Sequence, residues 1–185
     1  MKINLYKRFL FLSIFIYFLW KIYFLFFGQL ELINDPLTNL LGNLSCIFLK
    51  EMNFDSSFHQ LSVLDNANIL RAHLKIADRI VVFIDNNCNG LDLHLLIFIF
   101  CISYGKGKIS LLSSIFIFFI FWLIIFISNS IRISLLALLV YKGVPYFDLF
   151  HKYVFSSFVY ILIFIMMLIW TRLVNNSYME IRKID

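Results

Sequence analysis

The chain has 185 residues, of which 62% are apolar and 19% aromatic, with a net charge of +5 and a mean hydropathy of +0.88. This composition excludes an ordinary soluble domain and predicts one integral membrane protein with about four to six membrane segments. The basic residues gather near the amino terminus, around residues 104–108 and near the carboxyl terminus. Because such clusters are typical of cytoplasmic segments that flank membrane helices, we expect no nucleic-acid partner.

The amino-terminal half begins with an apolar run over residues 9–27, which is long enough as a helix, at about 28 Å, to cross a bilayer. We expect a retained signal anchor, because no small-residue cleavage site follows the run. Residues 37–49 are amphipathic and reach only about 20 Å, which predicts an interfacial or re-entrant helix. Residues 51–90 form the most polar segment, and β-branched residues in it predict a small extracytoplasmic β-hairpin that turns near Ala77 and Asp78.

The carboxyl-terminal half contains the other predicted spans, at residues 91–104, 109–128 and 154–171. Residues 133–141 are too few to cross, so we expect a second interfacial or re-entrant helix there. The predicted fold class is therefore an all-α polytopic integral membrane bundle, with about four full spans, two short re-entrant or interfacial helices and the small β-hairpin. Residues 1–185 form a single membrane-embedded domain in this prediction.

Three polar islands interrupt the apolar carboxyl-terminal half, at residues 88–90, 129–132 and 148–151. They supply a thiol from Cys88, a guanidinium from Arg132 and an imidazole from His151. The predicted crossings bring all three islands to the same membrane face. Because an arginine at mid-bilayer costs about 2.5–3.5 kcal/mol on translocon scales, polar groups at the edges of membrane segments indicate a function.

Cys88 is the candidate nucleophile of this set. It precedes a predicted helix, whose unpaired backbone N–H groups and positive dipole end favour a thiolate. It also lies beside Asn89 and Gly90 rather than among aliphatic residues, and Gly90 lets a substrate or backbone approach closely. We expect the other two cysteines, Cys46 and Cys101, to be small core residues.

The other two islands have both a structural and a functional interpretation. Arg132 complements the dipole at the end of a helix, or it holds a substrate carbonyl or carboxylate and stabilises an oxyanion, with Asn129 on the same face. Asp148 is placed to cap the last helix, and it is also placed to orient His151. His151 is either an ordinary interfacial histidine or a neutral base near a helix amino terminus.

The order and context of these residues resemble the exosortase and archaeosortase family of membrane transpeptidases, particularly its short Bacteroidetes-type, exosortase-like members. The resemblance covers roughly residues 68–170. In this stretch a strand-like run ends in Cys88-Asn89-Gly90-Leu91, and a span and a basic turn follow. A second span then ends in Asn129-Ser130-Ile131-Arg132-Ile133, and Asp148-Leu149-Phe150-His151 opens the last span.

The resemblance implies a membrane cysteine protease or transpeptidase in which Cys88 is the nucleophile, His151 the acid/base and Arg132 the third catalytic group. The implied substrates are exported proteins that end in a short motif, a transmembrane helix and a basic tail. The enzyme would cleave this sorting signal through a cysteine thioester and transfer the product to an acceptor. The implied location is the bacterial cytoplasmic (inner) membrane, in contact with membrane lipid, as a multi-pass protein whose active site faces the periplasm.

Two other functions fit the same residues. One is a non-catalytic membrane assembly subunit, in which the islands only cap helices and pair with each other. The other is a membrane acyltransferase acting on a lipid or a glycan. A zinc site built from Cys88, His94 and His151 lacks an evident fourth ligand, so we expect no metal and no other cofactor.

Overall fold

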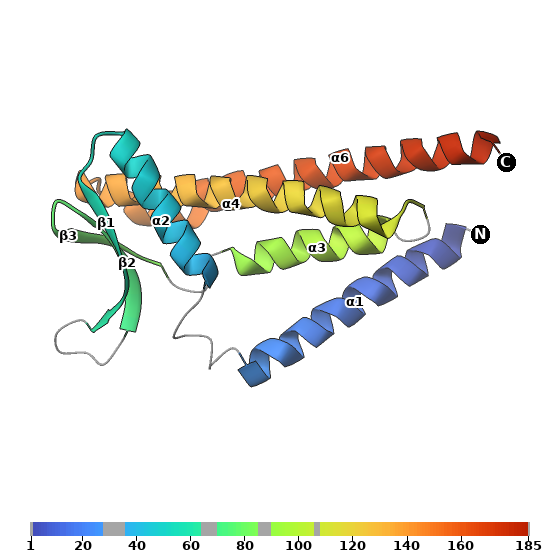
Figure 1. The fold of residues 1–185 in the computed structure, drawn as a ribbon, viewed down its shortest axis with the longest axis horizontal. Helices are drawn as coiled ribbons and strands as arrows, with labels where there is room; N and C mark the ends of the chain where they lie inside the picture. Colours follow the sequence, from blue (N-terminus) through green and yellow to red (C-terminus); the bar gives the residue numbers. More distant parts are fainter. Residues whose placement is uncertain (1, 28–35, 64–69, 85–89, 106–107, 185) are drawn as a thin grey trace. The chain divides into compact units, whose positions relative to one another are not determined.

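The computed structural model describes residues 2–27, 36–63, 70–84, 90–105 and 108–184 (Figure 1). Its chain divides into two compact units. The helical unit consists of α1 (Lys2–Phe27), α3 (Leu91–Gly105) from Asp92, α4 (Leu111–Tyr141) up to Ile124 and α6 (Phe155–Ile184) from Ile161. The mixed unit consists of α2 (Pro36–Glu51), β1 (Ser56–Val63), β2 (Leu70–Ile76), β3 (Arg79–Ile84), α4 from Ile125, α5 (Phe147–Leu149), η2 (Phe150–Val154) and α6 up to Tyr160.

The sheet of the mixed unit is antiparallel, with the strand order β1-β2-β3. The predicted hairpin is confirmed as β2 and β3, which turn through Ala77 and Asp78 with positive φ angles of 48° and 63°. Positive φ at both central residues is the requirement of a type I′ turn, whose twist matches that of the flanking strands. The first strand was not predicted, because its sequence is largely polar and contains no β-branched run.

Helix α2 packs against β1 and β2 and covers one face of the sheet (Figure 1). Leu41 and Leu49 from the helix and Leu74 and Ile76 from β2 are almost completely buried in this core. The ring of Phe58 on β1 lies directly over Gly42, where a Cβ atom would come within 2.3 Å of a ring carbon. A glycine at this helix position therefore allows the strand to approach.

The same helix is joined to α4 through serine side chains. The Ser45 hydroxyl lies 3.1 Å from the Ser130 carbonyl oxygen, and the Ser134 hydroxyl lies 3.1 Å from the Ser45 carbonyl oxygen. All three serines are buried. Small residues let two helix backbones approach closely, and hydroxyl-to-carbonyl bonds then hold them together. These contacts fix the turn of α4 that carries the second polar island.

Helix α4 runs without a break from Leu111 to Tyr141. The predicted division into a span ending at residue 128 and a separate short helix over 133–141 is therefore wrong. The polar island does not end the helix, because Asn129 and Ser130 are buried and the Ser130 hydroxyl donates to the Phe126 carbonyl oxygen one turn earlier. The helix ends instead at Tyr141, just before Gly143 (φ 66°), and the N–H groups of residues 143 and 144 bond to the Val140 and Leu139 carbonyls.

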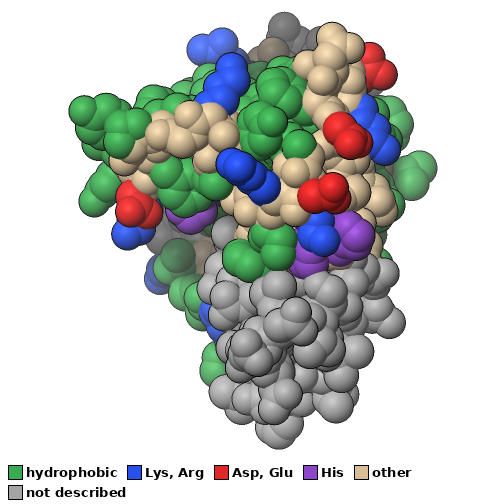
Figure 2. All heavy atoms as spheres, turned by 90° about the vertical axis from the view of Figure 1, so that its left-hand side faces the viewer, with side chains coloured by type: hydrophobic (Ala, Val, Ile, Leu, Met, Phe, Trp, Pro, Cys, Tyr) green, Lys and Arg blue, Asp and Glu red, His purple; other side chains and the backbone are tan. Residues whose placement is uncertain are grey.

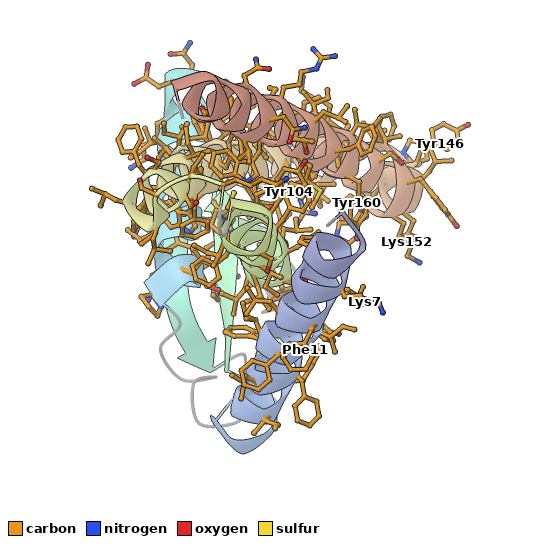
Figure 3. All side chains as sticks on the ribbon, turned by 90° about the vertical axis from the view of Figure 1, so that its right-hand side faces the viewer. Lys7, Phe11, Tyr104, Tyr146, Lys152 and Tyr160 are labelled. Atoms are coloured by element: carbon orange, nitrogen blue, oxygen red, sulfur yellow. The ribbon has the colours of Figure 1, made fainter. Side chains whose placement is uncertain are left out.

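Aromatic side chains join the elements of the helical unit. The Phe9 ring of α1 meets the rings of Phe100 and Tyr104 on α3 edge-on, with ring centres 6.1 and 6.2 Å apart. The Tyr104 hydroxyl donates to the side-chain oxygen of Asn175 on α6 over 3.2 Å. On the other side of α1, Phe11 points away from the helix ribbons (Figure 3) and is 72% exposed.

Two helical segments among the described residues are long and apolar enough to cross a membrane, Leu111–Tyr141 and Phe147–Ser177. Only 22% of the apolar window of each is buried, whereas the core helix of a soluble protein is mostly buried. Exposed side chains such as Leu112 and Phe158 suit a lipid environment. The apolar segments Phe9–Ile22 and Leu91–Gly105 are shorter. Two of the four expected spans are thus supported by length and composition, and the other two stay predictions.

Candidate functional site

The three polar islands all fall within the residue ranges of the mixed unit. Cys88 and Asn89 lie outside the described residues. Gly90, which immediately precedes α3, has a φ of 78°. This left-handed conformation costs glycine nothing and strains other residues, so the backbone after Cys88 requires this glycine.

Asn129 and Arg132 lie on α4, three residues apart and hence on the same side of the helix. Asn129 is completely buried, whereas Arg132 is partly exposed. Between them in sequence, Ser130 accepts the hydrogen bond from Ser45 described above. The position of Arg132 is therefore set by the packing of α2 on α4.

Asp148 and His151 lie in the short helical segment that leads into α6. The prediction that Asp148 caps this helix is wrong, because the helix begins at Phe147 with Tyr146 as its N-cap residue and no side-chain cap. Asp148 is exposed in the first turn, where a carboxylate complements the helix dipole without capping it. A cap at Asp148 requires the helix to begin at residue 149, but it begins two residues earlier, at Phe147.

His151 belongs to η2, a single π-helical turn between α5 and α6. Its ring is nearly parallel to the Phe147 ring, with ring centres 5.7 Å apart and an angle of 13° between the planes. The Ser156 hydroxyl donates to its backbone carbonyl over 3.3 Å. Single π turns inside α-helices are frequent at functional sites, because the extra residue redirects a side chain.

The site is electrostatically connected across two helices. Three charged groups act on the His151 imidazole, namely Arg132 from α4 and Asp148 and Lys152 from its own segment. The tertiary structure thus places the guanidinium of the second island where its charge acts on the imidazole of the third. Lys152 points outward into solvent (Figure 3), so its charge is the more strongly screened.

The two cysteines expected to be core residues are buried, Cys46 in α2 and Cys101 in α3. Burial raises the pKa of the Cys46 thiol, and a hydrogen bond from the Ser56 side chain and the charge of Lys50 only partly oppose this. A raised pKa leaves little thiolate near neutral pH, so Cys46 is a poor nucleophile.

No group of three or more His, Cys, Asp or Glu side chains is arranged to hold a metal ion within the part of the chain that the structure describes. His94, a ligand of the zinc alternative, is buried in the helical unit with its ring centre 5.5 Å from that of Trp122. Cys88, the thiol ligand of this alternative, lies outside the described residues.

Two features of the site were missed by the sequence analysis. The serine contacts between α2 and α4 have a signal in the sequence, because Ser130 and Ser134 are spaced as small residues are at close helix pairs. Lys152, whose charge acts on His151, is adjacent to it in the chain.

No model of a protein family matches this sequence, and no curated protein or solved structure is significantly similar to it.

Proposed function

We propose that this protein is a membrane cysteine peptidase or transpeptidase that cleaves a carboxyl-terminal sorting signal of exported proteins. The observation that carries the proposal is the electrostatic proximity of Arg132 and His151, which come from different helices. The unit that contains them also contains Gly90, two residues after Cys88. Acyl transfer by a cysteine uses a thiol nucleophile, a base and a donor to the developing oxyanion, and an imidazole and a guanidinium can supply the last two.

Helix lengths support a common depth for the two described groups. Leu111 and Arg132 are 21 residues apart, and so are His151 and Arg172. At 1.5 Å per residue each separation is about 32 Å, close to the roughly 30 Å hydrocarbon thickness of a bilayer. Arg132 and His151 then lie at one interface, and Leu111 and Arg172 lie at the other. The basic residues around 104–108 assign that second interface to the cytoplasm, so the active site faces the periplasm.

In the proposed reaction, His151 accepts the proton of the Cys88 thiol, and the thiolate attacks the carbonyl carbon of the scissile peptide bond. Arg132 donates to the oxygen on which negative charge develops. His151 returns the proton to the leaving nitrogen as the C–N bond breaks, which leaves a thioester on Cys88. An amine acceptor or water then attacks the thioester and restores the thiol.

A substrate with its own membrane helix suits this arrangement. Its cleavage motif is confined to two dimensions and held at the depth of the interface, so positioning replaces a deep pocket. The proposed protein is a multi-pass enzyme of the bacterial cytoplasmic membrane and needs no cofactor for this chemistry.

The test is processing of a tailed substrate in cells that carry Cys88→Ala. Loss of processing together with accumulation of the precursor is expected, and the matched variant Cys46→Ala should process normally because Cys46 is buried away from substrate. In the purified Arg132→Lys variant, acyl transfer should be slower although the charge is kept, because the bidentate fork is lost. A thioester on Cys88, detected as a mass increase of the intact protein, separates this enzyme from an assembly subunit. Normal precursor processing by Cys88→Ala would refute the proposal.

A further inference from the structure

Four polar side chains lie together at the end of the helical unit where α3 leads into α4. Tyr104 is in the last turn of α3, and its hydroxyl donates to the side-chain oxygen of Asn175 on α6 over 3.2 Å. The Nζ atom of Lys108 lies over the Tyr104 ring, 3.8 Å from the ring centre. Arg172 precedes Asn175 by three residues on α6, and residues three apart are neighbours on a helix surface. None of the four belongs to the proposed catalytic set.

The position of Lys108 is fixed by contacts of both its backbone and its side chain. Its backbone N–H bonds to the Gly105 carbonyl oxygen over 3.1 Å. The Tyr104 ring beneath its ammonium group is stacked on Phe100, with ring centres 5.6 Å apart, and meets Phe9 of α1 edge-on. The ring face attracts the cation. An ammonium group has three N–H donors, and the ring face takes up only part of them.

The two residues of α6 add further nitrogen donors. The Asn175 side-chain oxygen accepts from Tyr104, and the amide nitrogen of Asn175 carries two more N–H groups. Arg172 is exposed, and its planar guanidinium presents five N–H donors in a fork that matches the geometry of phosphate. The cluster therefore combines two positive charges with donors from separate parts of the chain.

The positive charge of this cluster is not offset nearby. On the face that contains the strands, Asp and Glu side chains lie among Lys and Arg side chains (Figure 2). Among the side chains of the helical unit that the structure describes, the only carboxylate is that of Asp92. Asp92 precedes Tyr104 by 12 residues on α3, which is about 18 Å along the helix. Salt screens charges beyond about 8 Å, so this carboxylate does not neutralise the cluster.

We infer that Lys108 and Arg172, with the Asn175 amide, form a binding site for the phosphate group of an anionic phospholipid. The cluster lies beside ends of the two segments that are long and apolar enough to cross a membrane, Leu111–Tyr141 and Phe147–Ser177. Lipid headgroups surround the ends of such segments, and basic pockets between membrane helices bind anionic headgroups. Leu112, just beyond the turn, is 78% exposed and suits contact with acyl chains.

The experiment is a titration of the purified full chain in non-ionic detergent micelles with phosphatidylglycerol, followed by native mass spectrometry. We expect one retained lipid per chain, bound more tightly than phosphatidylcholine, which has the same phosphate but no net charge. Lys108→Gln and Arg172→Gln should each weaken binding at least about fivefold, which corresponds to about 1 kcal/mol per basic residue near an anionic surface. Arg172 is exposed, so its replacement should leave the fold intact, and circular dichroism checks both variants.

Lys7→Gln is the matched control, because it removes the same charge from another lysine of the helical unit. Lys7 is exposed on α1 and points away from α3 (Figure 3). This variant should bind phosphatidylglycerol as the unchanged protein does. Inorganic phosphate at the same concentration should not displace the lipid, because it has no acyl chains.

Four results would each overturn the inference. They are equal retention of phosphatidylglycerol and phosphatidylcholine, unchanged affinity in Arg172→Gln, equal weakening in Lys7→Gln, and displacement of the lipid by inorganic phosphate. Equal weakening in Lys7→Gln would mean that diffuse positive charge attracts the lipid, and displacement by phosphate would mean that the site takes a soluble anion. None of these measurements involves processing by Cys88, so the two proposals fail independently.

Discussion

Replacement of Gly42 by alanine tests whether contact between α2 and β1 holds the mixed unit together. A Cβ atom at this position would lie 2.3, 2.4 and 2.6 Å from three ring carbons of Phe58. Ordinary contacts begin near 3.4 Å, so the ring or the strand must move by about 1 Å. Overpacking of this kind costs about 1–3 kcal/mol, and the better helix propensity of alanine returns about 0.8–1.0 kcal/mol. Because all three contacts would be shorter than 3.0 Å, we expect a cost in the upper half of this range, about 2–3 kcal/mol, and hence a net destabilisation of about 1–2 kcal/mol.

Hydrogen exchange of the α2 and β1 amides, measured by mass spectrometry in detergent micelles, is the assay. If the mixed unit loses 1–2 kcal/mol of stability, amide exchange that requires the unit to open should be roughly 5–30-fold faster. The matched control is Asn43→Ala, because Asn43 is the exposed neighbour of Gly42 on the same helix and gains helix propensity without a clash. In the double variant Gly42→Ala/Phe58→Leu the smaller side chain should restore part of the protection.

Exchange that is equal or slower in Gly42→Ala, as in Asn43→Ala, would refute the reasoning. In that case the Phe58 ring has room to move away at no cost, and the close approach of strand and helix is not what stabilises the unit. An accelerated exchange that Phe58→Leu does not relieve would place the strain elsewhere in α2.

Three further outcomes follow from single contacts. Ala77→Asn should stabilise the turn by about 0.5–1 kcal/mol, because asparagine tolerates the positive φ better than alanine. Hydrogen exchange of the β2 and β3 amides should therefore be slower, and unchanged exchange would contradict this. Ser134→Ala removes a hydroxyl that lies 3.1 Å from the Ser45 carbonyl oxygen. It should lower the free energy of unfolding, measured by denaturant titration, by about 0.5–1.5 kcal/mol. An unaltered midpoint would mean that this hydrogen bond contributes nothing to stability. Iodoacetamide near neutral pH should label the intact protein at Cys88 and spare Cys46, because the raised pKa of the Cys46 thiol suppresses its thiolate. Labelling that persists in Cys88→Ser would contradict this.

Several elements of the fold were predictable because their signals are local. The apolar runs predicted the helices that the structure places at Lys2–Phe27, Pro36–Glu51 and Leu91–Gly105. The β-branched residues of β3 and the turn at Ala77 and Asp78 predicted the hairpin. Each of these features depends on residues close together in the chain.

The continuity of α4 was not predictable in this way. In the sequence, Asn129 and Arg132 indicate the end of an apolar span, and a break there is the simplest interpretation. The helix continues because Ser45 of α2 and Ser134 supply hydrogen bonds and close packing at this turn. A partner distant in the sequence thus makes a polar stretch compatible with a buried helix interior.

The sequence by itself determined that this is a very apolar chain with helices interrupted by a small polar β-region, and that its thiol, guanidinium and imidazole occur in three separate islands. It also determined the positions of α2, α3 and the turn between β2 and β3, since hydrophobic period and turn chemistry act over a few residues. Only the tertiary structure decided that Arg132 lies in electrostatic range of His151 and that His59 faces His73. The physical reason is that such proximities depend on which faces of distant elements pack together, and no local pattern specifies that choice.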